Sequence, residues 1–296
     1  MQRPRTAAIG DVLAHKYILR ALLGDGGMGV VFCAEQPTLE RTVAIKLLHR
    51  ELVADPTIVR RFRDEARAAS QLHHPNVVAV IDFGETDDGT PFLVMEHVRG
   101  TSLTRIVQAT GPLAIRRAAG LVRQILAALD EAHGARVVHG DVKCDNVLVE
   151  QLHDGVELVK MVDFGLARCG SDATLSAADG AMVVAGTPEY MAPELIAGGG
   201  VTVATDLYAT GVILYELVTG STPFAGGAAG AIMTRHQRDA VVPPSLRRPD
   251  RVVAIELERV MMRALAKDPT ERYPSASAFA TALTAATPAF EPAPDR

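Results

Sequence analysis

The chain has 296 residues, enough to bury a sizeable hydrophobic core. Hydrophobic residues make up 48% and charged residues 22%, as in ordinary globular proteins. The net charge of −5 lacks the cationic excess of nucleic-acid-binding domains, so we expect no nucleic-acid partner. No stretch approaches the length of a membrane span, and no apolar run follows Arg3 and Arg5 as in a signal peptide. Three cysteines, odd in number and spread along the chain, argue against a disulfide framework and favour a cytoplasmic location.

The first third of the chain reads mostly as strands. Short, largely apolar runs separated by Gly, Pro or Asp predict strands at Tyr17–Leu23, Val30–Glu35, Thr42–Leu48, Val77–Phe83 and Phe92–Glu96.

One helix interrupts these strands. Apolar residues recur at helical spacing from Ile58 to Leu72, with Asp55 as the expected N-cap and Pro56 at the first position. The helix is expected to end before His74, because Pro75 disfavours helical backbone in the residue that precedes it.

From Thr101 onward the pattern becomes mainly helical. Long apolar or amphipathic segments predict helices at Pro112–His133, Val203–Thr219 and Val252–Ala266. A small β-rich region is therefore followed by a larger helical one, and the Ala- and Pro-rich residues 286–296 read as a tail or linker.

The segment from Gly24 to Val31 contains the spacing G-x-G-x-x-G-x-V. Glycines let backbone amides approach phosphate oxygens, because no Cβ stands in the way. A dinucleotide-binding turn has the same spacing, but such a turn opens a helix. Here the apolar run after Gly29 favours a strand, so we expect a loop between two strands that covers phosphates.

Lys46 lies within the apolar run Val43–Leu48. A lysine in a strand is ordinarily a surface residue, but a charge among apolar neighbours needs an anionic partner. Nucleotide phosphates and Glu65, which falls near the apolar stripe of the interrupting helix, are the two available partners.

Residues 137–149 carry an aspartate, Asp141, followed by Lys143 and Asn146 and then by a strand-like run. An aspartate on a loop can orient an attacking hydroxyl, a lysine can neutralise phosphoryl charge, and an asparagine oxygen can ligate Mg²⁺. The predicted strand Leu158–Val162 leads directly into Asp163, whose carboxylate is well placed to hold a divalent cation.

With these motifs in this order, the sequence resembles the eukaryotic-type serine/threonine protein kinases, most of all their bacterial branch. The resemblance runs from Tyr17 to Leu283. It includes the segment from Gly186 to Glu194, which is similar to the end of a kinase activation segment. Asp206 matches a buried aspartate that holds the backbone of the catalytic loop, here residues 139–146. Arg272 matches an arginine that pairs with Glu194.

The resemblance implies a bilobal α+β protein kinase fold over residues 17–285. The small β-rich N-lobe, with one regulatory helix, would comprise residues 17–97, and the larger, mainly helical C-lobe residues 98–285. The implied activity is ATP-dependent phosphorylation of Ser and Thr hydroxyls on protein substrates, with ATP and Mg²⁺ as cofactors and Mn²⁺ as a substitute for Mg²⁺. A homodimer is left open.

The resemblance also implies roles for individual residues. The expected catalytic residues are Asp141 as base, Lys143, and Lys46 paired with Glu65; the expected metal ligands are Asn146 and Asp163. The expected nucleotide-binding residues are Leu23, Gly24, Asp25, Gly26, Gly27, Met28, Gly29, Val31, Ala44, Lys46, Met95, Glu96, Val98 and Leu148.

Three positions depart from the family pattern: Gly140 replaces the usual arginine, Cys144-Asp145 the usual Pro-Glu, and His97 a residue that is often aromatic. His-Gly-Asp also occurs in small-molecule phosphotransferases, so such an enzyme is one alternative, and a pseudokinase scaffold is another. Glycine cannot pair with a loop phosphate, so we hypothesise that activity depends only weakly on phosphorylation of the activation segment.

Two residues near Asp141 are expected to be structural. Cys144 should be a packing residue, because the nearby carboxylates of Asp141 and Asp145 oppose a reactive thiolate. His139 should pack and hydrogen-bond near Asp163 and Phe164 without transferring protons.

Overall fold

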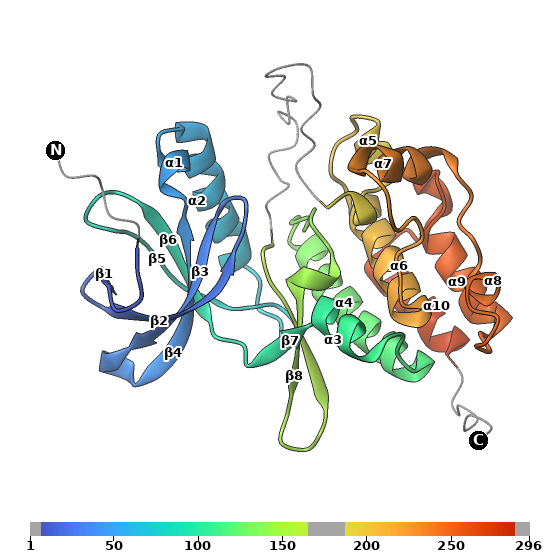
Figure 1. Ribbon diagram of the computed structural model, residues 1–296, viewed down its shortest axis with the longest axis horizontal. Helices are drawn as coiled ribbons and strands as arrows, with labels where there is room; N and C mark the ends of the chain where they lie inside the picture. The colour runs from blue at the N-terminus through green and yellow to red at the C-terminus, as the bar shows by residue number, and fades with distance from the viewer. Residues whose placement is uncertain (1–6, 165–186, 288–296) are drawn as a thin grey trace. The chain divides into compact units, whose positions relative to one another are not determined.

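The computed structural model describes residues 7–164 and 187–287, which fall into two units. The first unit contains the residues up to 73 together with 78–99, and the second contains residues 74–77 and those from 100 onward. The observed elements agree with the α+β fold that the resemblance implies. The first unit is a β-sheet with helices, and the second is mainly helical (Figure 1). The predicted domain boundaries at 97 and 285 stay predictions.

The first unit is built on a six-stranded antiparallel sheet in the order β1-β2-β3-β4-β6-β5. Its strands are β1 Val12–Leu13, β2 Tyr17–Asp25, β3 Gly29–Gln36, β4 Arg41–Leu48, β5 Val80–Glu85 and β6 Pro91–Glu96. Its core is formed by inward-facing residues at alternate positions along the strands, among them Leu19, Phe32, Ile45 and Val94.

Two helices accompany this sheet, α1 Arg50–Val53 and α2 Pro56–Ser70. The predicted cap is confirmed: the Asp55 side chain accepts a hydrogen bond from Thr57 N, and Pro56 opens α2. Helix α2 ends at Ser70, before His74 as expected. The predicted start of β5 was wrong: this strand begins at Val80 rather than Val77, because Val77 instead bridges Met161 in the second unit.

The second unit carries a small sheet in the order β7-β8-β9 and a set of helices. The strands are β7 Gly100–Ser102, β8 Val147–Gln151 and β9 Glu157–Met161. The helices are α3 Leu103–Thr110, α4 Ile115–Gly134, α5 Pro193–Ile196, α6 Val203–Thr219, α7 Ala229–Arg238, α8 Pro244–Arg247, α9 Ile255–Ala264 and α10 Ala276–Ala286.

Helix α6 is the core of the second unit. Its bounds match the prediction, and it is buried around nearly its whole circumference, as expected for a helix that is apolar on every face. Thr202 and Thr205 form a reciprocal capping box at its start. At its end, the guanidinium groups of Arg248 and Arg251 donate to the carbonyl oxygens of Thr219 and Val218, respectively.

The buried guanidinium of Arg272 joins several segments of this unit. It donates to both carboxylate oxygens of Glu194 at 2.7 Å, which confirms the predicted pair, and to the carbonyl oxygens of Ala204 and Ala266. The side chain of Arg272 is fully buried, so these partners replace its lost hydration.

Replacing Arg272 with alanine should lower the free energy of unfolding by about 3–5 kcal/mol, because the Glu194 carboxylate would be left without its cation. Urea denaturation followed by circular dichroism measures this change. Arg259→Ala, at an exposed position of α9, is the matched control and should cost less than about 0.5 kcal/mol. Equal stabilities of the two variants would contradict the assigned role of Arg272.

A buried histidine makes this unit sensitive to acid. His236 accepts a hydrogen bond from the Tyr208 hydroxyl at 2.8 Å and lies against the ring of Phe224. Burial, with a further contribution from the Lys267 cation, lowers the pKa of His236 from 6.5 to about 4.

The unfolded chain therefore binds more protons than the folded chain between pH 6.5 and about pH 4, and stability falls as the pH falls through this range. The loss attributable to His236 should reach about 3 kcal/mol at 1.36 kcal/mol per pKa unit. Melting temperatures measured from pH 7 to pH 4 should fall less steeply for His236→Gln than for the wild type, whereas His153→Gln, in an exposed turn, should follow the wild type. Parallel curves for His236→Gln and the wild type would refute this assignment.

Candidate active site

The predicted glycine-rich loop is the turn of the β2–β3 hairpin. Its ends are closed by a hydrogen bond from Gly26 N to Gly29 O at 3.0 Å. A Cβ on Gly29 would lie 2.2 Å from the carbonyl oxygen of Leu47, so only glycine lets β3 approach β4 this closely. The positions from Leu23 to Gly27 are exposed.

Lys46 and Glu65 meet in the interior of the first unit. Lys46 Nζ lies 3.5 Å from Glu65 Oε1, and the two side chains are 5% and 3% exposed. This contact confirms the predicted pairing of Lys46, on β4, with Glu65, on α2. Burying such a pair is costly, but separating its partners is strongly destabilising, because each would be left as an uncompensated buried charge. The pairing therefore holds the lysine in one orientation.

Three residues expected around the adenine ring, Val31, Ala44 and Met95, share one face of the sheet with Lys46. Val31 pairs with Lys46 across β3 and β4, and Ala44 pairs with Met95 across β4 and β6. Directly paired residues and residues two apart on one strand point to the same side, so these four side chains lie together. Leu148, by contrast, belongs to β8 of the second unit.

The strand that carries Met95 ends at Glu96. The backbone N–H of Glu96 donates to Ala79 O at 3.0 Å, so of its backbone groups only the carbonyl can serve the expected hydrogen bond to adenine. Val98 follows two residues later, beyond the end of β6.

The second unit brings the expected catalytic residues together on the loop between α4 and β8. Lys143 Nζ donates to Asp141 Oδ2 at 2.6 Å, and Asn146 Nδ2 donates to the same oxygen at 3.1 Å and to the Asp141 carbonyl at 2.9 Å. Because the Asn146 nitrogen is bonded to Asp141, its amide oxygen is the atom that can ligate a cation.

Asp163 follows β9 with a φ of +61°, a left-handed conformation that is uncommon for residues other than glycine. Val162 N donates to Asn146 O at 3.0 Å, which fastens the segment of Asp163 to the loop of Asn146. One amide oxygen and one carboxylate are a donor set suited to Mg²⁺, which usually binds few protein oxygens together with substrate phosphates. The chain from Gly165 to Gly186 lies outside the described residues.

His139 connects the segment of Asp163 to the loop of Asp141. Its ring Nε2 donates to Val162 O at 3.0 Å, its Nδ1 accepts from Asp141 N at 3.3 Å, and the ring lies 4.5 Å from that of Phe164. Burial lowers the pKa of His139, which keeps the ring neutral. The prediction that it packs and hydrogen-bonds near Phe164 is confirmed.

Asp206 at the start of α6 fixes the backbone of the catalytic loop. Its carboxylate accepts from His139 N at 2.9 Å, from Gly140 N at 2.8 Å and from His133 Nε2 at 2.8 Å. The predicted role of Asp206 is confirmed, whereas His133 was missed. Gly140 adopts a φ of +75°, which glycine accepts without the strain that a side chain would add.

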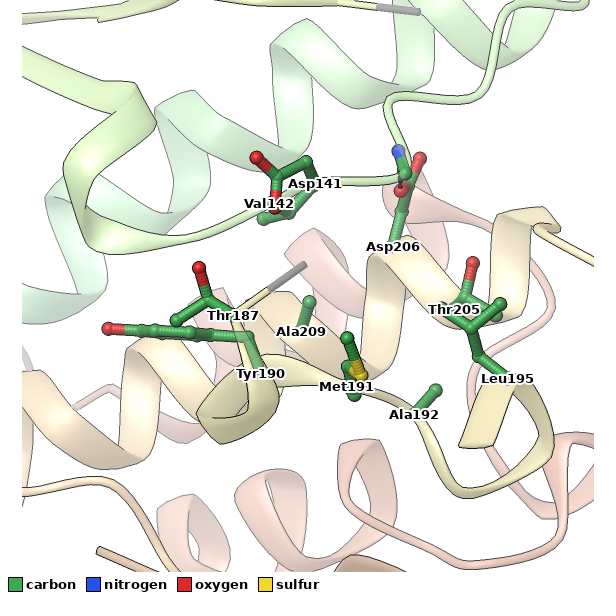
Figure 2. Close-up of a pocket in the computed structure, with 11 residues that line it drawn as sticks. Asp141, Val142, Thr187, Tyr190, Met191, Ala192, Leu195, Thr205, Asp206 and Ala209 are labelled. Carbon is green, nitrogen blue, oxygen red and sulfur yellow. Dashed lines mark hydrogen bonds between the residues drawn. The ribbon is translucent and has the colours of Figure 1, made fainter. Parts of the chain in front are cut away.

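A small pocket lies beside this loop, and Figure 2 shows Asp141 on one of its walls. The facing wall is formed by the segment 187–195, including Thr187, Tyr190 and Leu195. Asp206 and Ala209 of α6 close the pocket. Thr187 and Asp141 line the same pocket.

A carboxylate that the sequence interpretation missed joins the two walls. Glu216 Oε2 accepts from the Tyr190 hydroxyl at 2.6 Å and from Cys144 Sγ at 3.3 Å. Burial raises the pKa of Glu216, and burial next to this carboxylate raises the pKa of the Cys144 thiol. Cys144 is thus an inert packing residue, as expected. The run 203–219 is otherwise apolar but holds two acidic residues, Asp206 and Glu216, and the second of them was the signal that could have identified this group.

Comparison with known proteins agrees with this geometry. The family model described as "Protein kinase domain" matches residues 17–283. The chain belongs to the protein kinase family.

Similar kinases occur in bacteria. It is 44% identical over 282 residues to the serine/threonine-protein kinase pkn3 of Myxococcus xanthus, covering 94% of this chain and 51% of that protein. It is 38% identical over 268 residues to the serine/threonine-protein kinase PrkC of Bacillus subtilis, covering 90% of this chain and 40% of that protein. This kinase chain thus spans about half the length, or less, of these relatives.

The crystal structure of the Mycobacterium tuberculosis PknI kinase domain matches this fold with a TM-score of 0.72 at 28% identity. The match covers 95% of this chain and all of that one (100%). Within residues 7–164 and 187–287, no helix is both long and apolar enough to cross a membrane.

Proposed function

We propose that this chain is the catalytic domain of a serine/threonine protein kinase that transfers the γ-phosphoryl group of ATP to Ser and Thr hydroxyls of proteins. The observation that carries the proposal is the cluster of Asp141, Lys143 and Asn146 beside a pocket walled by the segment 187–195. An acceptor hydroxyl in that pocket would lie next to a carboxylate whose orientation two side chains fix.

Each residue then has a chemical task. Asp141 orients the acceptor hydroxyl and takes its proton, while Lys143 offsets negative charge on the transferring phosphoryl group. Lys46, held by Glu65, binds the α- and β-phosphates, and the backbone amides of the glycine-rich loop approach the phosphate oxygens.

The adenine ring would be held by the shared face of the first unit. Val31, Ala44 and Met95 supply apolar contacts, and the backbone of Glu96 and Val98 supplies hydrogen bonds. The expected contact of Leu148, a residue of the second unit, stays a prediction. Asn146 and Asp163 would hold Mg²⁺, or Mn²⁺ in its place. The bound metal neutralises phosphate charge.

Two alternatives are less well supported. A small-molecule phosphotransferase has no need of a peptide platform, whereas here Glu194 and Arg272 hold the segment 187–195 against the pocket. A pseudokinase scaffold would tolerate loss of catalytic groups. Here Lys46, Asp141 and Asn146 are all present, and each contacts the partner expected for a catalytic role.

Purified protein incubated with labelled ATP, Mg²⁺ and generic peptides tests the proposal. Label should enter protein or peptide, and phosphoamino-acid analysis should yield phosphoserine or phosphothreonine, because a short side chain suits a hydroxyl held close to Asp141. Label confined to a small molecule, predominant phosphotyrosine, or no transfer at all would each overturn it.

Asp141→Asn should lower turnover by about 10² or more, because the amide keeps the shape but cannot take the proton. Lys46→Met should lose a comparable factor with the fold retained at lower stability, because the buried Glu65 carboxylate loses its cation. Initial rates at saturating ATP measure both effects, and Asp154→Asn, in the exposed β8–β9 turn, is the matched control. Near-full turnover by Asp141→Asn would show that another group is the base.

Gly140 offers no side chain to bind a phosphate on the activation segment, so dephosphorylation should lower the initial rate by less than about tenfold, or 1.4 kcal/mol of transition-state stabilisation. The measurement compares autophosphorylated enzyme before and after phosphatase treatment. The hydroxyls that could be phosphorylated are those of Ser171, Thr174, Ser176 and Thr187, and only Thr187 belongs to the described residues. Arg168 could partly replace the missing arginine as a phosphate partner, and it also lies outside the described residues. A larger drop that alanine substitutions at these hydroxyls reproduce would contradict the expectation.

A further inference from the structure

His49 makes two hydrogen bonds to the tip of the glycine-rich loop. Its backbone N–H donates to Met28 O at 2.9 Å, and its ring Nε2 lies 2.7 Å from Gly26 O. The same ring nitrogen is 3.2 Å from Asp25 Oδ1. His49 directly follows β4, the strand of Lys46, and precedes α1, so it links the end of that strand to the loop.

The contacts decide which ring nitrogen carries a hydrogen. Both neighbours of Nε2 are oxygen atoms that can only accept, the carbonyl of Gly26 and the carboxylate of Asp25. Nε2 must therefore be protonated and must donate. The His49 side chain is 26% exposed, while its acceptor Gly26 lies at an exposed position.

The ring bond also fixes the orientation of one peptide group. In a trans peptide the C=O and the following N–H point in opposite directions, so turning Gly26 C=O toward His49 turns Gly27 N–H away from it. Glycines on both sides of this bond permit many other orientations. A donor on the Gly26 carbonyl selects one of them.

We propose that His49 is a positioning residue for ATP, which orders the tip of the glycine-rich loop before the nucleotide binds. This inference rests on the proposed function, in which the loop amides hold phosphate oxygens. A loop already ordered loses less conformational entropy on binding, so His49 strengthens nucleotide binding without touching the reacting atoms.

The decisive comparison is between His49→Leu and His49→Gln. Leucine keeps the apolar bulk and the backbone N–H but has no side-chain donor, whereas the glutamine amide can place an N–H near the position of Nε2. His49→Leu should raise the KM for ATP about fivefold, the range expected for one hydrogen bond, with kcat within about twofold. His49→Gln should recover most of this loss.

A second measurement needs no catalysis. Amide hydrogen exchange of a peptide covering residues 24–29 in nucleotide-free protein should be about threefold or more faster in His49→Leu than in the wild type. His49→Gln should exchange at close to the wild-type rate. His153→Gln, at an exposed position away from the loop, should change neither exchange nor KM.

Unchanged exchange and unchanged KM in His49→Leu would overturn the inference. A joint loss of kcat and melting temperature, without rescue by glutamine, would also overturn it, because that outcome marks a structural role alone. If the wild type transferred no phosphoryl group, the proposed function and the ATP role would fail together. The exchange comparison would then still show whether His49 orders the loop.

Discussion

The buried carboxylate of Asp206 is the interaction on which the catalytic loop depends. A charge taken out of water must be satisfied by polar partners, and those available to Asp206 are two consecutive loop amides and the ring of His133. Satisfying the carboxylate therefore dictates the path of the chain at His139 and Gly140. That path includes a left-handed residue, and glycine at this position removes the strain that a side chain would impose. The position of Asp141 follows from it.

The first unit also contains buried charged groups, but there they position a side chain rather than a loop. Lys46 and Glu65 come from a strand and a helix, and their buried contact joins α2 to the sheet. In the second unit the charged groups around Asp141 stay partly exposed, at 19% for Lys143 and 23% for Asp141. Exposure leaves these groups accessible to a substrate, whereas the buried pair serves to hold a lysine in place. The two units thus use similar residue types for anchoring and for chemistry.

The sequence predicted local features well, because periodicity and capping act over a few residues. Asp55 caps α2 and α6 runs from Val203 to Thr219 as expected, and the family resemblance identified Arg272 and Asp206 with their partners. Contacts between distant segments were harder to foresee. Val77 lies outside the expected strand because it forms a bridge to Met161 instead. The role of Glu216 becomes recognisable only in the fold, which brings Cys144 and Tyr190 to its carboxylate. No local pattern encodes such pairings.

Helix α6 has one further consequence. Asp206 on its first turn holds the catalytic loop, and Glu216, further along the same helix, holds both Cys144 of that loop and Tyr190 of the facing segment. Both walls of the pocket, the loop of Asp141 and the segment 187–195, are therefore held by the same buried helix. The spacing between these two walls, and with it the room for an acceptor hydroxyl beside Asp141, depends on the backbone geometry of α6.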